Sequence, residues 1–157
     1  KNGTMFHDLL DYDDESFYQS HKTFKFDTIY KGGQGTYEIV AVGYSRIYPE
    51  NSGEFKYYQY AGITSEEDFN EFVDGVKGLS LYDTGVEPEY GDQLVTLSTC
   101  TNEDEDGRFF VVGRRTEQSR SHLSEETDIS TRILSSPGFF CENRDFYFGV
   151  KRSEVST

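Results

Sequence analysis

The sequence predicts a mainly β fold, a barrel or sandwich that carries helical insertions. Several segments between residues 23 and 115 alternate in hydrophobicity or are rich in β-branched and aromatic residues, which is typical of strands. The clearest helical repeat is confined to one segment, residues 65–77. The 157 residues suffice for one domain, and 12 Tyr and 13 Phe supply large side chains for its core.

The N-terminal part of the chain predicts short helices followed by a hairpin. Apolar residues at i, i+1, i+4 and i+5 give residues 5–10 one apolar helical face, and the acidic run at residues 13–15 begins a second short helix. Residues 23–30 alternate as a half-buried strand. A Gly-rich turn at residues 32–35 joins that strand to a long β-rich segment, residues 36–48, so the two form a hairpin.

The middle of the chain predicts a strand and then a helix. Residues 55–60 are rich in aromatic side chains and are expected to form a short strand with one buried face. Thr64 and Glu67 fit a capping box at the start of the helix at residues 65–77. Its apolar residues repeat at i, i+3, i+4 and i+7, and they are Phe69, Phe72, Val73 and Val76.

Composition and charge exclude several classes of function. The chain holds 15 basic and 29 acidic side chains, a net charge of −14, so a nucleic acid or an anionic membrane surface would be repelled. Nearly all of this acidic excess lies in residues 1–117. Two cysteines are too few for a disulfide framework and lack metal-ligand spacing. We expect no metal and no cofactor.

The last two predicted strands bring a thiol and a guanidinium together. An irregular connection, residues 79–91, leads to strands at residues 93–100 and 108–115. The polar, Gly-ended sequence between the strands is typical of an exposed hairpin loop. If Cys100 and Arg108 are opposed across that hairpin, their Cβ atoms lie roughly 4.5–5.5 Å apart on one face.

Such a pair can support nucleophilic catalysis. The reactive species of a cysteine is the thiolate, which a nearby cation favours, and an arginine can donate two hydrogen bonds to an oxyanion. Alternation places Thr96 and Ser98 on the face of Cys100. The acidic run at residues 103–106 opposes the thiolate and should point to solvent; it lacks the ligand spacing of a calcium loop. Taken alone, a lone cysteine near a strand end is more often a small buried hydrophobe.

The motif around this pair resembles a known signature. The sequence Thr-Leu-Ser-Thr-Cys at residues 96–100, followed eight residues later by Arg108, resembles the active site of sortases, the cysteine transpeptidases of Gram-positive bacteria. Further landmarks are similar to class B: Asn-Gly-Thr-Met-Phe at residues 2–6, the helix at residues 65–77, and Ser-Leu-Tyr-Asp-Thr-Gly at residues 80–85. The resemblance spans residues 1 to about 117. It implies an eight-stranded β-barrel, incomplete here, with a helical insertion before the cysteine-bearing strand.

The resemblance also implies an activity. Cys100 would attack the Thr–Gly or Thr–Asn bond of a cell-wall sorting signal and form a thioacyl-enzyme, which an amine of a peptidoglycan precursor or a pilin lysine would resolve. Arg108 would stabilise the oxyanion or position the substrate. Ser98, Thr99 and Leu97 would line the peptide groove. The implied location is the outer face of the membrane or the cell wall of a Gram-positive bacterium, with the membrane reached only through an N-terminal anchor.

The sequence departs from the family pattern at its beginning. Class B sortases place a catalytic histidine a few residues before the Asn-Gly-Thr-Met-Phe segment, and this sequence begins at Lys1. We therefore expect a truncated sortase that lacks this histidine, the earliest barrel strands and the anchor, and that has little activity alone. The three histidines present, His7, His21 and His122, match no family position.

The C-terminal part has no family counterpart. Residues 118–157 form an unmatched tail; residues 118–136 favour disorder, whereas the aromatic cluster near residues 139–148 could pack on the open barrel or derive from unrelated sequence. Cys141 is expected to be structural or incidental. Two alternatives to a transpeptidase stay open: a non-catalytic β-barrel module that binds peptides or partners, and a different Cys-His hydrolase that uses His7 or His122.

Overall fold

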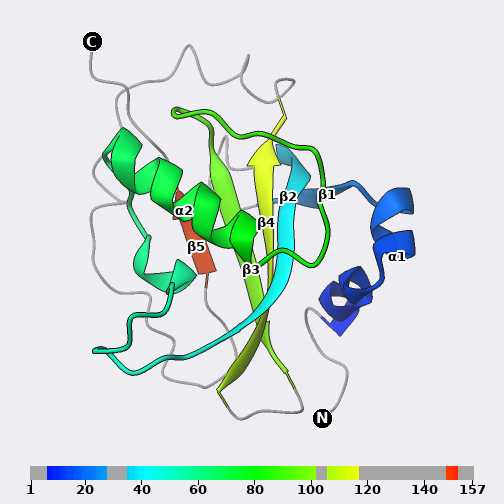
Figure 1. Cartoon of the computed structure of the whole chain (residues 1–157). Coiled ribbons are helices and arrows are strands. Elements are labelled where there is room, and N and C mark those ends of the chain that lie inside the picture. Colours follow the sequence, from blue (N-terminus) through cyan, green and yellow to red (C-terminus); the bar gives the residue numbers. More distant parts are fainter. Residues whose placement is uncertain (1–6, 28–34, 102–105, 117–147, 152–157) are drawn as a thin grey trace.

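The structure is a computed structural model that describes residues 7–27, 35–101, 106–116 and 148–151. In this part of the chain five antiparallel strands form one curled sheet in the order β1-β2-β4-β3-β5 (Figure 1). The predicted mainly β fold is confirmed. The strands are β1 (Thr23–Phe26), β2 (Gly35–Arg46), β3 (Leu94–Cys100), β4 (Gly107–Arg115) and β5 (Phe148–Lys151).

Two predicted hairpins form the body of the sheet. β1 pairs with β2, and Phe24 and Phe26 are half-buried while Thr23 and Lys25 are exposed, as the alternation predicts. β3 pairs with β4 from Leu94↔Arg114 to Cys100↔Arg108. The long-range pairing of β2 with β4 joins the two hairpins and places β4 between β2 and β3.

The helices are few and short. η1 (His7–Asp13) and η2 (Tyr57–Gln59) are 3-10 helices, and α1 (Glu15–Ser20) and α2 (Glu66–Gly78) are α-helices. The predicted helix at residues 65–77 is confirmed as α2, but its N-cap is Ser65, not Thr64. Ser65 has an extended backbone, and its Oγ accepts the backbone N–H of Asp68 at 3.1 Å.

The aromatic segment before α2 corrects a second prediction. Residues 55–60 do not form a strand; they turn through η2. Phe55 and Tyr60 pack against Phe72 of α2, whereas the ring of Tyr57 lies 5.1 Å from that of Phe110 on β4. The rings pack on two different elements, α2 and β4. A straight strand, which presents alternate side chains to one face, would not direct them in this way.

The core is divided between the two faces of the sheet. We call the face covered by α2 and η2 the α2 face and the face covered by η1 and α1 the α1 face. The buried residues of the α2 face are Val40, Ala41, Tyr57, Ile63, Phe69, Phe72, Val73, Val76, Leu94, Phe110 and Val112. Those of the α1 face are Leu9, Tyr12, Tyr18, Tyr37, Ile39, Val42, Val95, Leu97, Phe109 and Val111.

The predicted irregular connection at residues 79–91 runs between these parts and is tied down by side chains. The Tyr82 hydroxyl donates to the carbonyl oxygen of Tyr12 at 2.9 Å, and the Tyr18 hydroxyl donates to that of Thr84 at 3.2 Å. Arg114 on β4 pairs with Glu38 at 2.6 Å. The two tyrosine hydroxyls therefore join the N-terminal helices to the connection.

The C-terminal region is described only in part. Residues 148–151 form β5, which pairs with β3 in antiparallel register. Two predictions lie outside the described residues. They are the disorder of residues 118–136 and the Asn-Gly-Thr-Met-Phe landmark at residues 2–6. None of the helices in the described ranges has the length and apolar character needed to span a membrane.

Candidate active site

Cys100 and Arg108 are direct partners across the β3–β4 hairpin, as predicted. The backbone N–H of Thr101 donates to the carbonyl oxygen of Gly107 at 3.1 Å, which makes 101 and 107 a hydrogen-bonded pair. Hydrogen-bonded and non-hydrogen-bonded pairs alternate along an antiparallel ladder. Cys100 and Arg108 are therefore a non-hydrogen-bonded pair, the closer kind, with Cα atoms about 4.5 Å apart.

The guanidinium of Arg108 is held close to the sheet. The residue is only 9% exposed, and its Nη1 donates to the carbonyl oxygen of Gly107 at 2.8 Å. That carbonyl also accepts the N–H of Thr101, so it points toward β3. The positive group is thus kept on the side of β4 where Cys100 lies.

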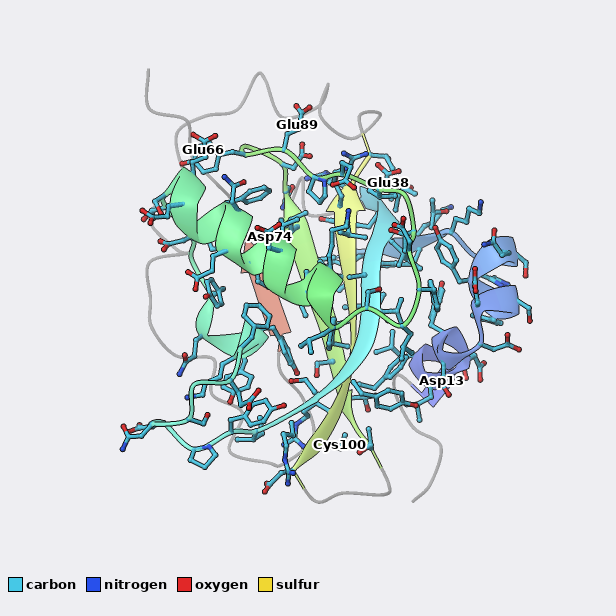
Figure 2. The ribbon with its side chains drawn as sticks, in the orientation of Figure 1. Asp13, Glu38, Glu66, Asp74, Glu89 and Cys100 are labelled. Atoms are coloured by element: carbon cyan, nitrogen blue, oxygen red, sulfur yellow. The ribbon has the colours of Figure 1, made fainter. Side chains whose placement is uncertain are left out.

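Cys100 is the last residue of β3 and is half-buried at that end of the sheet (Figure 2). A half-buried thiol at the end of a strand can be reached by a ligand. The pair can therefore supply a nucleophile and an oxyanion donor to one carbonyl group.

Ser98 lies on the same face and has a partner that sequence reasoning missed. Its hydroxyl forms a 2.7 Å hydrogen bond with the hydroxyl of Tyr57, and both residues are buried. This contact fixes η2 against the strand that carries Cys100. The two residues are 41 positions apart, and the aromatic richness of residues 55–60 was the sole signal in the sequence.

The other two predicted groove residues do not share this face. Leu97 is buried in the core of the α1 face, and Thr99 pairs with Phe109, whose ring belongs to that same core. Neighbours in a strand point to opposite sides. Of the three residues taken from the resemblance, the structure brings only Ser98 to the face of Cys100.

His21 contacts α1. His21 is exposed at the end of α1, where its ring stacks on Phe17 and its Nδ1 lies 3.0 Å from the Phe17 carbonyl oxygen. His122 and residues 103–105 lie outside the described residues. Within the described ranges no three His, Cys, Asp or Glu side chains gather as a metal site would require.

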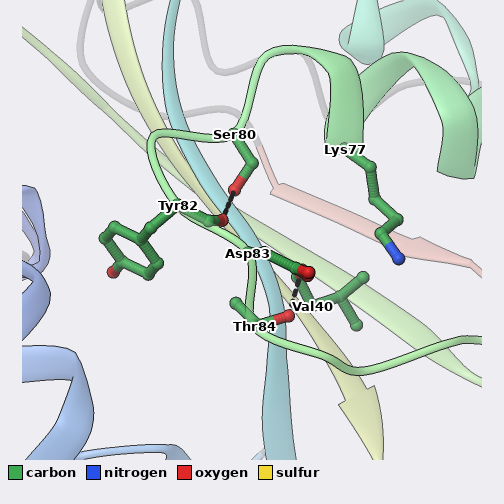
Figure 3. Close-up of a pocket in the computed structure, with 6 residues that line it drawn as sticks. All are labelled: Val40, Lys77, Ser80, Tyr82, Asp83 and Thr84. Carbon is green, nitrogen blue, oxygen red and sulfur yellow. Dashed lines mark hydrogen bonds between the residues drawn. The ribbon is translucent and has the colours of Figure 1, made fainter.

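A cavity of about 340 Å³ lies elsewhere, between the C-terminal end of α2, β2 and the connection that follows (Figure 3). Its hydroxyl groups are engaged: Ser80 donates to the carbonyl oxygen of Tyr82 at 2.8 Å, and Thr84 donates to that of Val40 at 2.7 Å. These bonds hold the connection on the sheet. The cavity is lined by Val40, Lys77, Ser80, Tyr82, Asp83 and Thr84, and neither member of the Cys100–Arg108 pair is among them.

Two curated relatives are similar in sequence. The chain is 34% identical over 116 residues to sortase B of Listeria monocytogenes, an alignment that covers 73% of this chain and 44% of the relative. It is 32% identical over 100 residues to sortase B of Staphylococcus aureus, covering 63% of this chain and 37% of the relative. The chain thus spans less than half the length of these relatives. No protein-family model matches it.

Solved structures agree with these relatives. The crystal structure of S. aureus sortase B matches with a TM-score of 0.59 and 26% identity over 73% of this chain and 51% of that one. An S. aureus sortase B–substrate complex matches with a TM-score of 0.55 and 27% identity over 73% of this chain and 50% of that one. Sortase B from the type II pilus of Streptococcus pneumoniae shares the fold, with a TM-score of 0.62, 23% identity and coverage of 74% and 62%. Sequence and fold agree, and the chain belongs to the class B sortase family, of which it spans a part.

Proposed function

We propose that this chain carries the nucleophile and the oxyanion-binding arginine of a sortase-type cysteine transpeptidase. The observation that carries the proposal is the direct pairing of Cys100 with Arg108 on one face of the β3–β4 hairpin. Membership of the class B sortase family supports it, because sortase signatures join a cysteine and an arginine at this spacing.

The proposed reaction has two steps. The Cys100 thiolate attacks the carbonyl carbon of a threonine in the sorting signal, the C–N bond breaks, and the leaving amine takes up one proton from solvent while a thioester forms. An acceptor amine then attacks the thioester carbonyl, loses a proton, and releases the Cys100 thiolate. In both steps Arg108 donates N–H groups to the carbonyl oxygen as it becomes an oxyanion.

The proposed substrate is a sorting-signal peptide. The S. aureus sortase B–substrate complex among the structural matches supports this choice of ligand. We assign Ser98 to the peptide groove, with the Tyr57 hydroxyl fixing its orientation. Leu97 and Thr99 would support the hairpin from the α1 face. The acceptor would be an amine of a peptidoglycan precursor or a pilin lysine, at the surface of a Gram-positive bacterium.

An activated ester tests the nucleophile directly. We would mix the chain with a short peptide that ends in threonine 4-nitrophenyl ester and follow the release of 4-nitrophenolate. This leaving group departs as an anion, so acylation needs no general acid. We expect a burst of one 4-nitrophenolate per chain and a mass increase of one peptide acyl group on Cys100.

Two variants separate the roles. Cys100→Ala should abolish the burst, and Arg108→Lys should slow acylation by roughly 10- to 1,000-fold, because lysine keeps the charge but lacks the planar fork. An acylation rate of Arg108→Lys equal to that of the parent would contradict the oxyanion role. A chain that binds the peptide but whose thiol is never acylated would instead be the peptide-binding module.

A further inference from the structure

A serine continues the row formed by Cys100 and Arg108. On β2, Ser45 is the register partner of Arg108, which on its other side pairs with Cys100. Directly paired residues point to the same face, so the three side chains lie in line across β2, β4 and β3 on the α2 face. The neighbouring rows agree, since Ala41 and Val112 are partners and both lie in the core of that face.

The hydroxyl of Ser45 is buried and has no hydrogen-bond partner in the part of the chain that the structure describes. Such groups are exceptions in folded proteins, because a buried polar atom loses its bonds to water. Within this row the neighbouring polar group is a guanidinium, which has five N–H donors and no acceptor. A serine oxygen is a suitable acceptor for one of them.

The ladder places the two residues side by side. The N–H of Ile47 donates to the carbonyl oxygen of Asp106 at 2.9 Å, so the alternation makes Ser45 and Arg108 a hydrogen-bonded pair with Cα atoms about 5.5 Å apart. Gly107 already holds Nη1 of Arg108 on the β3 side. A second anchor at Ser45 would fix the plane of the guanidinium as well as one nitrogen.

We propose that Ser45 is a positioning residue for Arg108: its hydroxyl oxygen accepts a guanidinium N–H when an anion or a developing oxyanion is bound beside Cys100. The inference deepens the proposed function and rests on it. Ser45 itself touches no reacting atom; it acts by holding the arginine fork in the orientation that the oxyanion needs.

Acylation kinetics with the threonine 4-nitrophenyl ester provide the first test. Ser45→Ala should lower the maximal acylation rate about tenfold with KM changed less than about twofold, as expected for an interaction made mainly in the transition state. Ser45→Thr keeps the hydroxyl and should restore most of the rate. Ser52→Ala is the matched control, because Ser52 also has a buried hydroxyl without a described partner but lies in the turn after β2.

Charge-selective labelling gives a readout that does not depend on turnover. The ratio of Cys100 labelling rates for a sulfonate-bearing and an ammonium-bearing methanethiosulfonate reports a cation beside the sulfur. The Arg108→Gln variant gives the ratio expected without the cation. We expect the ratio of Ser45→Ala to fall several-fold toward that value and the ratio of Ser52→Ala to equal that of the parent chain.

The outcomes separate the two proposals. If the parent chain is never acylated by the ester, the transpeptidase proposal is refuted. If the labelling ratio of that chain still falls on Ser45→Ala substitution, the positioning role of Ser45 is kept. Ser45→Ala that matches Ser52→Ala in both assays would overturn the positioning role. Slower acylation with an unchanged ratio would also overturn it, since the arginine would not have moved.

Discussion

Two glycines of α2 provide a sharp test of how the aromatic segment packs. A methyl group added to Gly75 would overlap the ring of Phe55, with Cδ2 only 2.6 Å away, whereas one added to Gly78 would meet nothing within 4 Å. Both glycines lie in the same helix, and neither has a positive φ. Gly75 lies inside the helix and Gly78 is its last residue, so the backbone gain from alanine is no larger at Gly78, and only Gly75 has a ring in the way.

The magnitudes follow from two opposing effects. Replacing glycine by alanine inside a helix is worth up to about 1 kcal/mol of stability. Displacing the Phe55 ring is an overpacking change, which costs roughly 1–3 kcal/mol. Gly78→Ala should therefore raise the free energy of unfolding by up to about 1 kcal/mol, and Gly75→Ala should lower it by about 0–2 kcal/mol.

Urea unfolding followed by far-ultraviolet circular dichroism measures both variants. In a Phe55→Ala background the obstructing ring is gone, so Gly75→Ala should become stabilising, with a coupling energy of roughly 1–3 kcal/mol. If Gly75→Ala stabilises the parent chain as much as Gly78→Ala does, the Phe55 ring does not rest on Gly75. The packing of residues 55–60 against α2 would then be wrong.

Three further predictions concern the same fold. Gly43→Ala should cost more stability than Gly75→Ala, over about 2 kcal/mol in urea unfolding, because its methyl would overlap the backbone carbonyl of Leu79, which cannot rotate away. Ser65→Ala should lower the free energy of unfolding by about 1 kcal/mol and Thr64→Ala by much less, since Ser65 is the N-cap; equal losses would contradict this assignment. Burial raises the pKa of Tyr60 from 10.0 to about 12. The stability that the protonated phenol contributes is therefore complete below about pH 10 and lost as the pH rises toward 12, so the urea midpoint should fall over that range and fall less in Tyr60→Phe.

Short sequence patterns predicted the elements whose formation depends on neighbouring residues in the sequence. Alternation and β-rich composition identified β1 to β4, and one apolar stripe identified α2, whereas β5 was not predicted. The cap of α2 was misplaced by one residue because Thr64 and Ser65 carry equivalent hydroxyls, and only the extended backbone of Ser65 separates them. The segment at residues 55–60 was misjudged because its rings pack on α2 and β4 separately, which no short window of sequence reveals.

The same distinction applies to the candidate site. The pairing of Cys100 with Arg108 could be predicted because one short hairpin carries both residues. Tyr57 and Ser45 reach the site through η2 and through the pairing of β2 with β4, which are long-range features. Leu97 was chosen for its place in a sequence motif, although its strand turns it toward the opposite core.

The hairpin that bears Cys100 and Arg108 has its register set well away from its tip. Buried pairs such as Leu97↔Val111 and Val95↔Gly113 lock the two strands further along, at positions that contact the core. The acidic segment between Cys100 and Arg108 is therefore not needed to align these two residues. Changes in its length or charge should therefore leave Cys100 and Arg108 in register.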